Sequence, residues 1–278
     1  MDILYQSNKK IYLTIDFEDY RYNFLRDFSG SKQYFIDEVE KQYWILKNIL
    51  SEINAKAMFY IVGEVAKMLS NEVVNDINRN YDIGSHSLSH LKLLKMDSNE
   101  IYEDTKKSVN LIEDKFSKKI EHYRAPYFSI DSNENNYYEG IAKCGIKFSS
   151  SLRISKFRHN SARIIKLKDF PIIEIPLRSI GFGSKRITII GGTYFRLFPI
   201  SLIEYLIRDS IKKNFVPIIY LHNYEPDYQS LPIKNNNNFK LKANDWLRRA
   251  GRISVRQKLK ILSVNYKFES LNDIVKNY

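Results

Sequence analysis

The first third of the chain alternates short apolar, β-prone runs with longer segments of helical periodicity. Residues 11–15, 57–62 and 81–85 are such runs, and over residues 35–53 apolar side chains recur every three or four positions. This spacing is typical of an amphipathic helix. Strands that alternate with helices through short links form parallel sheets, either open or closed into a barrel. We therefore predict an α/β fold whose functional groups lie at the carboxyl ends of the strands.

The same signals predict most of the remaining elements. Asp97 and Glu100 have the spacing of a capping box that would open a helix reaching to about residue 116. Further strands are expected at 120–127, 172–176, 186–190 and 216–222, and further helices at 199–212 and from about 255. The tetra-asparagine run at 235–238 is expected to be a solvated loop.

Two histidines come directly after the third predicted strand. His86 and His90 are two of five histidines in the chain, and a spacing of four on a helical turn would let both bind one divalent ion. For this spacing alone, a pair of surface histidines is the alternative. The acidic run Asp16-Phe17-Glu18-Asp19 follows the first strand. Because it supplies carboxylates at the same edge of the sheet, it favours a metal site.

Two more strand ends carry residues suited to catalysis. The run 120–127 ends in Arg124-Ala125-Pro126-Tyr127, and the run 216–222 ends in His222. An arginine beside carboxylates would orient one of them and lower its pKa. A lone histidine at a strand end is more often structural than catalytic. Four strand ends that all carry such groups are much harder to assign to chance.

The ordered motifs resemble those of the polysaccharide deacetylases with a NodB homology domain, the carbohydrate esterase family 4 type. The motifs are Thr14-Ile15-Asp16, His86-Ser87-Leu88-Ser89-His90, Arg124-Ala125-Pro126-Tyr127 and Leu221-His222. More narrowly, the chain is similar to the branch of bacterial exopolysaccharide and surface-glycan loci, whose first motif has the form D-x-E-D-aromatic. The resemblance extends to residues 56–63, 191–196, 220–225 and 247–252. It implies a distorted (β/α) barrel of seven or eight strands with one divalent metal, usually zinc, in its mouth.

The resemblance implies that His86 and His90 bind the metal together with one carboxylate. If the acidic segment stays extended, Asp16 and Glu18 face one side and Asp19 the other, which favours Glu18 as the ligand. If the chain already turns at the strand end, Asp19 could reach the ion instead. Both alternatives stay open at this point.

The other implied roles are those of amide hydrolysis, which needs a base for the attacking water and an acid for the leaving amine. Asp16 is the candidate general base, oriented by Arg124, and His222 is the candidate general acid. The backbone N–H of Tyr127 would complete an oxyanion site with the metal.

One motif departs from the family pattern. Phe148-Ser149-Ser150-Ser151 resembles the fourth motif, but Ser149 stands where relatives commonly have an aspartate that pairs with the catalytic histidine. Glu225, close to His222 in sequence, could replace that partner. Reduced activity is the other consequence to be expected.

Composition limits the other classes of function. The chain of 278 residues has one cysteine, no apolar run of transmembrane length and a formal charge of +12. We expect a soluble cytoplasmic protein that forms one domain over residues 1–278, with a helical tail from about 243 to 278. The charge comes with no nucleic-acid-binding motif, so we expect no nucleic acid as a partner. A peripheral membrane contact and the oligomeric state stay open. For the basic stretch 247–252, a solvated face is favoured over contact with a phosphate or an acidic sugar.

These observations predict a metal-dependent hydrolase that removes an N-acetyl group from a sugar in the biosynthesis of capsule, lipopolysaccharide or exopolysaccharide. Its substrate would be an acetylated sugar or polysaccharide precursor, linked to a nucleotide or a lipid. Alternatives are an O-acetyl esterase or a non-sugar amide hydrolase that uses the same site. A third alternative is a catalytically weak glycan-binding protein.

Overall fold

The computed structural model describes residues 9–130, 135–155, 163–165, 171–182, 185–233 and 239–275. In this part of the chain the main sheet has the strand order β11 (Ile218–His222), β1 (Lys10–Phe17), β2 (Met58–Ile61), β3 (Asp82–Ser85), β4 (His122–Tyr123), β5 (Phe148–Ser149), β8 (Ile172–Glu174) and β7 (Arg163–Ile165). A further strand, β12 (Lys267–Glu269), pairs with the first residues of β1. A small second sheet consists of β10 (Lys185–Thr188), β9 (Leu177–Phe182) and β6 (Arg153–Ile154).

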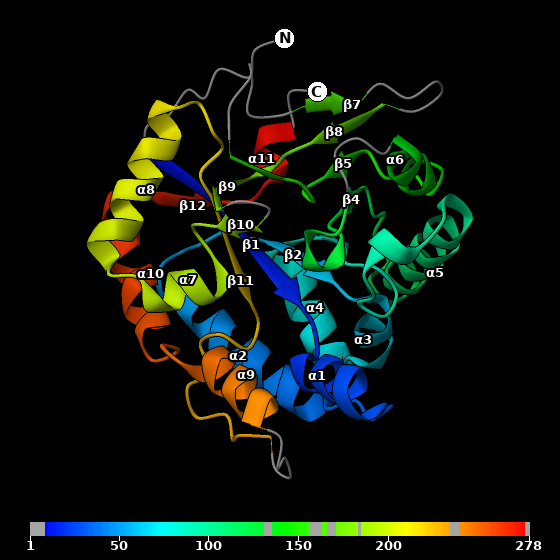
Figure 1. The fold of residues 1–278 in the computed structure, drawn as a ribbon, viewed down its shortest axis with the longest axis horizontal. Coiled ribbons are helices and arrows are strands. Elements are labelled where there is room, and N and C mark those ends of the chain that lie inside the picture. Colours follow the sequence, from blue (N-terminus) through cyan, green and yellow to red (C-terminus); the bar gives the residue numbers. More distant parts are fainter. Residues whose placement is uncertain are drawn as a thin grey trace.

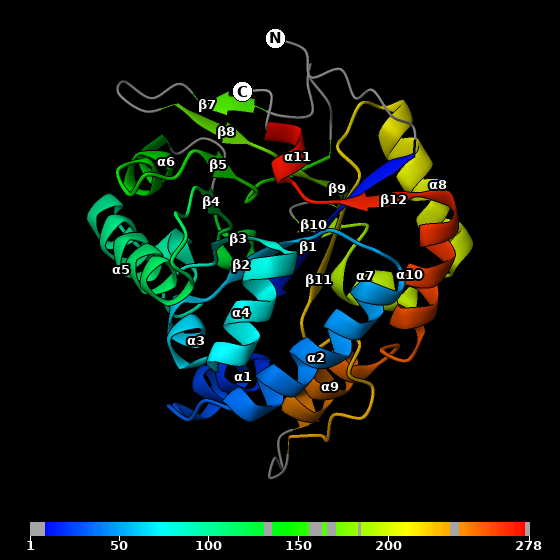
Figure 2. The ribbon, with the colours of Figure 1, turned by 180° about the vertical axis from the view of Figure 1, so that it is seen from behind.

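Helices surround the main sheet (Figures 1 and 2). One side of the molecule carries α3 (Gly63–Met68), α4 (Asn71–Asn80), α5 (Ser98–Phe116) and α6 (Asn135–Ala142), and the other carries α7 (Gly192–Leu197), α8 (Ile200–Lys212) and α10 (Ser254–Asn265). At the end of the molecule toward which β1 points lie α1 (Tyr20–Ser29), α2 (Ile36–Glu52) and α9 (Phe239–Arg249), whereas α11 (Asn272–Val275) lies near the opposite end. Two short 3₁₀ helices, η1 (Leu93–Lys95) and η2 (Pro126–Phe128), complete the list.

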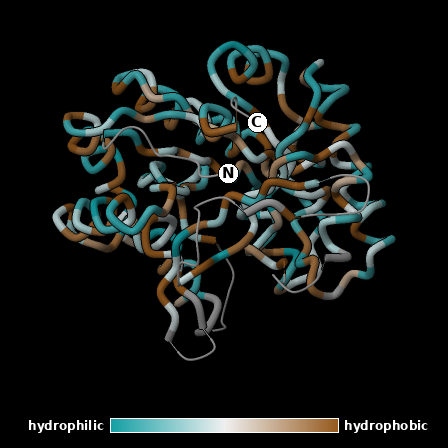
Figure 3. The backbone as a smooth tube through the Cα atoms, turned by 90° about the horizontal axis from the view of Figure 1, so that it is seen from above, coloured by the Kyte–Doolittle hydropathy of each residue, from teal (hydrophilic) through white to brown (hydrophobic). Residues whose placement is uncertain are grey.

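The main sheet curls into an incomplete barrel. Its strands pair in parallel except at β7, which is antiparallel to β8, and β11 and β7 form the two ends of the strand order. This is the distorted (β/α) barrel that the sequence predicts. The helices show hydrophobic and hydrophilic residues in alternation along the chain (Figure 3), as expected when one face of each covers the sheet.

The central strand β1 is buried on both faces. Ile11, Leu13 and Ile15 pack in the larger hydrophobic cluster, whereas Tyr12 packs in a second cluster with Met58 of β2. Because side chains alternate along a strand, Thr14 and Asp16 share the face of Tyr12. The strand therefore delivers a carboxylate to the inside of the barrel at its carboxyl end.

Most predicted elements occur where the sequence places them. The helix predicted at 35–53 is α2, and α5 begins with the predicted capping box of Asp97 and Glu100. The run 120–127 forms only the two-residue strand β4, because the chain turns into η2 at Pro126. The region from about 243 to 278, predicted as a helical tail, also contains β12, whose three residues are too few to give a periodic signal. The single-domain organisation stays a prediction, and the run at 235–238 lies outside the described residues.

No helix in the described part of the chain is long and apolar enough to cross a membrane.

Candidate active site

The register of β1 brings two strand ends together. Asp16 lies opposite His222 of β11 on one side and Tyr60 of β2 on the other. Parallel strands end at the same edge, so the chain segments that follow β1, β3, β4 and β11 all meet there. This is why residues more than 200 positions apart in sequence, such as Asp16 and His222, are neighbours.

Glu18, His86 and His90 form a buried cluster that could hold a metal ion. One ligand atom from each lies within 4.8 Å of the others. The Nε2 atom of His90 is 2.7 Å from Glu18 Oε2, and the two imidazole centroids are 5.0 Å apart. Two nitrogen ligands and one carboxylate are a donor set that suits zinc and leaves coordination positions open.

The prediction that His86 and His90 lie on a helical turn is wrong. The segment from His86 to His90 is an irregular loop, in which Ser87 and His90 have φ values of +64° and +58°. The loop is held by its backbone: Ser87 O accepts hydrogen bonds from Gly63 N at 3.0 Å and Ser108 Oγ at 2.8 Å. Hydrogen bonds from α3 and α5 to the loop backbone therefore fix the segment that carries both imidazoles, and sequence spacing alone does not reveal them.

The protonation states fit a divalent metal. The Nδ1 atom of His86 is 2.7 Å from the carbonyl oxygen of Arg124. Because a carbonyl oxygen can only accept a hydrogen bond, Nδ1 carries the proton and Nε2 has a free lone pair. Burial lowers the pKa of His86 to about 4, which keeps the ring neutral. Burial raises the pKa of Glu18, but the charge and hydrogen bond of His90 outweigh it and hold that pKa well below its usual value. His86 and Glu18 thus present ligand atoms in the form that a metal requires.

Asp19 is used for a different purpose. Its carboxylate caps α1 by accepting a hydrogen bond from Tyr22 N at 2.9 Å, and it also accepts one from Phe35 N at 2.5 Å. Of the two carboxylates that the sequence left open, Glu18 faces the histidines and Asp19 does not. The chain turns into a helix directly after Glu18, and the Asp19 side chain satisfies the exposed N–H groups of that helix.

Asp16 forms an ion pair with Arg124. The Nη1 atom of Arg124 is 2.8 Å from Asp16 Oδ1. The fully buried guanidinium is fixed further by Thr14 Oγ1 at 2.9 Å and by Ser150, whose carbonyl and hydroxyl oxygens accept from it at 3.0 Å. Burial raises the pKa of Asp16, but the charge and hydrogen bond of Arg124 outweigh it and lower that pKa below its usual value. Asp16 is therefore an ionised carboxylate, whose Oδ2 lies 3.9 Å from His86 Nε2.

His222 pairs with Glu225. The Nδ1 atom of His222 is 3.1 Å from Glu225 Oε1, and its Nε2 atom is 3.9 Å from Glu18 Oε1. Burial lowers the pKa of His222, but the hydrogen bond and charge of Glu225 and the charge of Glu18 raise it above its ordinary value. Ser149 instead donates to Ser151 Oγ at 2.9 Å. Glu225 thus occupies the position of partner that Ser149 cannot fill.

A cavity of about 490 Å³ joins these groups. Asp16, Glu18, His86, His90 and His222 all line it. Tyr127 also lines it, with its ring 4.7 Å from that of His90 and a φ of +56°. The part of Tyr127 in an oxyanion site stays a prediction.

A family model described as "Polysaccharide deacetylase" matches residues 6–148, which is just over half of the chain. The chain belongs to the polysaccharide deacetylase family. A second model, a domain of unknown function (DUF3473), matches residues 149–276. The deacetylase region carries Asp16, the three candidate ligands and Arg124, whereas His222 and Glu225 lie in the second region. No curated protein matches the chain.

Solved structures with the same fold include carbohydrate esterases of family 4. A protein from Mycobacterium smegmatis, described as a polysaccharide deacetylase, has a TM-score of 0.67 at 15% identity, over 98% of this chain and 91% of its own. A family 4 pseudoenzyme from Bacillus anthracis has a TM-score of 0.51 at 13% identity, over 97% of this chain and 66% of its own. A mutant of that pseudoenzyme with restored enzymatic activity has a TM-score of 0.52 at 14% identity, over 97% and 68%. These likenesses establish the fold of this deacetylase-family chain.

Several residues that position the candidate site were given no role in the sequence analysis. Asn23 donates to Glu18 Oε2 at 3.0 Å, and Asn223 Oδ1 accepts from Glu18 N at 3.0 Å. Thr14 and Ser150 hold Arg124. Thr14 and Ser150 stand in quoted motifs without a role of their own, whereas nothing in the pattern around Asn23 marks it.

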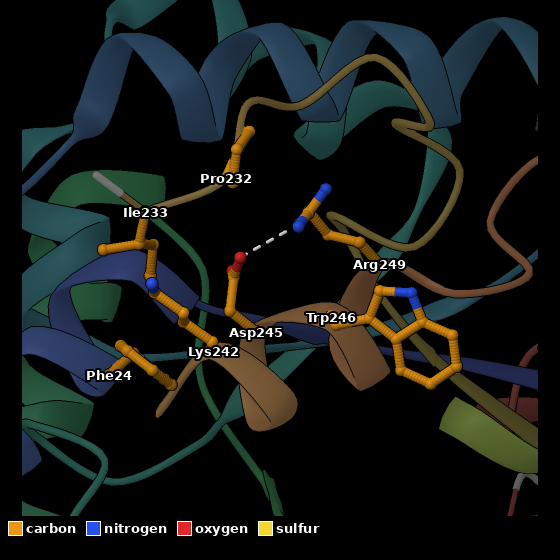
Figure 4. Close-up of a pocket in the computed structure, with 7 residues that line it drawn as sticks. All are labelled: Phe24, Pro232, Ile233, Lys242, Asp245, Trp246 and Arg249. Atoms are coloured by element: carbon orange, nitrogen blue, oxygen red, sulfur yellow. Dashed lines mark hydrogen bonds and ion pairs between the residues drawn. The ribbon is translucent and has the colours of Figure 1, made fainter. Parts of the chain in front are cut away.

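A second cavity, of about 360 Å³, lies beside α9, on the face of this helix that points away from the first cavity (Figure 4). Lys242, Asp245, Trp246 and Arg249 line it, and Arg249 Nε is 3.1 Å from Asp245 Oδ2. The helix residues Asn244, Leu247 and Arg248 line the cavity of the candidate active site instead. Helix α9 therefore forms one wall of each cavity.

Proposed function

We propose that this protein is a metal-dependent hydrolase that removes the acetyl group from an N-acetylated sugar in the synthesis of a bacterial surface polysaccharide. The observation that carries the proposal is the meeting of three groups at one cavity. They are the candidate metal ligands Glu18, His86 and His90, the Asp16–Arg124 pair and the His222–Glu225 pair. Each group suits one requirement of amide hydrolysis.

A divalent metal held by Glu18, His86 and His90 would polarise the acetyl carbonyl and acidify the attacking water. Asp16 accepts the proton of the water at Oδ2, because Arg124 occupies Oδ1. His222 donates a proton from Nε2 to the leaving sugar nitrogen, while Glu225 holds its Nδ1–H. Arg124 and Glu225 thus fix which atom of each catalytic side chain faces the substrate.

The direct test measures zinc content and acetate release from N-acetylated sugars for the wild type, His86→Ala and Asp16→Asn. We expect His86→Ala to lose zinc and turnover together. Asp16→Asn should keep zinc and lose about 10²–10⁴-fold in kcat. The control is His122→Gln, because His122 contacts Asn272 away from this site. Full turnover by His86→Ala would refute the proposal.

The same assay separates the alternatives. O-acetylated sugars and cyclic ureides, tested beside the acetamido sugars, show by which compound turns over whether the reaction is ester, ureide or sugar amide hydrolysis. Affinity for glycan that does not depend on zinc, without turnover of any compound, would instead favour the glycan-binding alternative. The His222–Glu225 pair favours an enzyme over a binding protein, because Glu225 gives His222 the carboxylate partner that Ser149 cannot supply.

A further inference from the structure

The basic stretch at residues 247–252 does not form the solvated face that the sequence favours. Arg252 is 2% exposed and donates to Asp227 O at 3.1 Å. Arg249 pairs with Asp245 on the far side of α9 (Figure 4). Arg248 lies on the opposite side of the helix and lines the cavity of the candidate metal site. The three arginines therefore have three different environments, and one of them belongs to the site.

Arg248 differs from its neighbours in having no direct partner among the described residues. Among the described residues, none forms an ion pair or hydrogen bond with its guanidinium, although the side chain is partly buried. Burial lowers the pKa of Arg248, but nearby groups, Tyr224 and Glu18 among them, raise it above its ordinary value. These groups favour the charged form without pairing with it, so the N–H donors of the guanidinium stay available to an anionic ligand.

Lys92 also lines this cavity, together with Arg153 and Arg196. Lys92 lies in the segment after His90, and its Nζ is 5.1 Å from the ring centroid of Tyr127, which in turn packs on His90. Within the described part of the chain, the Lys92 ammonium contacts the Tyr127 ring and forms no ion pair with a carboxylate. Lys92 and Arg248 thus approach one cavity from two distant segments.

The acidic side chains of the cavity do not balance these charges, because each already has a partner. Asp16 pairs with Arg124, Glu18 with His90, Asp27 with Arg26, and Glu225 with His222. A divalent metal at Glu18 would add further positive charge. The cavity therefore carries uncompensated positive charge, which an anionic ligand would neutralise.

We propose that Arg248 and Lys92 form an anion-recognition subsite, so that the acetylated sugar bound beside the metal carries a phosphate or carboxylate group. A guanidinium fork matches both groups, because each offers two oxygens in one plane. The inference rests on the proposed deacetylation and names its substrate class. The two sources of such an anion are the diphosphate of an activated sugar and the carboxylate of a neighbouring uronic acid.

The test compares the affinities of one charged probe of each kind with that of a neutral probe. Calorimetry on zinc-loaded Asp16→Asn protein, in which turnover is slow, would use UDP-N-acetylglucosamine, a disaccharide of N-acetylglucosamine and glucuronate, and neutral diacetylchitobiose. We expect at least one charged probe to bind more tightly than the neutral one. Adding Arg248→Gln should weaken that probe by about tenfold, equivalent to about 1.4 kcal/mol, and change the neutral probe much less. The probe that responds identifies the source of the anion.

The matched control is Arg256→Gln, which removes the same charge from an exposed arginine that pairs with Glu52 on the outside of the molecule. It should leave all affinities unchanged. The subsite is refuted if both charged probes bind no more tightly than the neutral one. It is also refuted if Arg248→Gln leaves the affinities of the charged probes unchanged, which is the result expected if the metal alone binds them. Equal weakening of all three affinities would refute it as well. Because affinity is measured without turnover, failure of the deacetylation itself would not mask the result.

Discussion

At the scale of single residues, the partner of His222 shows how a departure from a motif can be compensated. Ser149 removes the carboxylate that relatives place opposite the histidine. Glu225, three positions after His222 and 3.1 Å from its Nδ1, supplies one from the turn that follows β11. Arg196 Nε lies 3.8 Å from the same Glu225 oxygen and forms a second ion pair with it.

The variant Glu225→Gln tests this compensation. The amide keeps a hydrogen bond to Nδ1 but removes the negative charge, so the imidazolium form of His222 is stabilised less. We expect kcat to fall by at least about tenfold with zinc content unchanged. A steady-state assay with metal analysis measures both. Ser149→Ala serves as the control, and a Glu225→Gln enzyme with wild-type kcat would contradict the role of Glu225.

The candidate site also shows which residues a sequence can reveal. Asp16, Glu18 and the two histidines follow apolar runs directly, so the rule that strands of a parallel sheet end together predicts their meeting. The choice of Glu18 over Asp19 could not be predicted, because it depends on where the chain turns into α1. Arg248 was assigned to a solvated face, because its burial depends on how α9 packs, which a run of basic residues does not show.

At the scale of elements, α5 supports the histidine loop. Asp104 of this helix accepts a hydrogen bond from Leu88 N at 3.0 Å, and Ser108 binds the loop carbonyl of Ser87. The capping box at Asp97 is visible in the sequence, and the long helix that follows it was predicted correctly. The contacts of Asp104 and Ser108 with the loop were not predictable, because the positions of these two residues in the sequence follow no pattern that marks them.

Removing the helix cap should weaken the fold without touching the chemistry. In Asp97→Ala, the backbone N–H groups of Asn99 and Glu100 lose their acceptor. We expect the free energy of unfolding to fall by about 1 kcal/mol. Urea denaturation measures the change, with Asp114→Ala in the same helix as a control. An unchanged unfolding midpoint would show that the cap does not stabilise α5.

Asp104 predicts a specific pH dependence of stability. Burial raises its pKa from 3.8 to about 6. Between these values the folded chain binds more protons than the unfolded chain, so the free energy of unfolding falls as pH rises through this window. Asp104→Asn should remove that contribution, which is at most about 3 kcal/mol. Urea unfolding at several pH values compares the two proteins, and parallel curves would contradict the prediction.

At the scale of the whole molecule, the two family regions meet at the candidate site and in the central sheet. Strands β11 and β12 of the second region pair with β1 of the first. His222, Glu225 and Arg248 line the same cavity as the candidate metal ligands. The domain of unknown function therefore supplies part of the candidate active site.

This arrangement predicts that the first region does not fold alone. A fragment of residues 1–148 would expose the edge of β1 and leave the hydrophobic residues around it without cover. We expect no cooperative thermal unfolding transition for the fragment, in contrast to the full chain. Calorimetry makes the comparison, and a fragment that melts cooperatively would show that the two regions are separate folding units.

The central claim is that Glu18, His86 and His90 hold one divalent metal ion. It is tested most directly by an anomalous difference map of crystals grown with zinc and recorded at the zinc absorption edge. We predict a single strong peak enclosed by these three side chains, with Asp19 still bound to the start of α1. A map without a peak there, or with the ion bound by Asp19 in place of Glu18, would contradict the account.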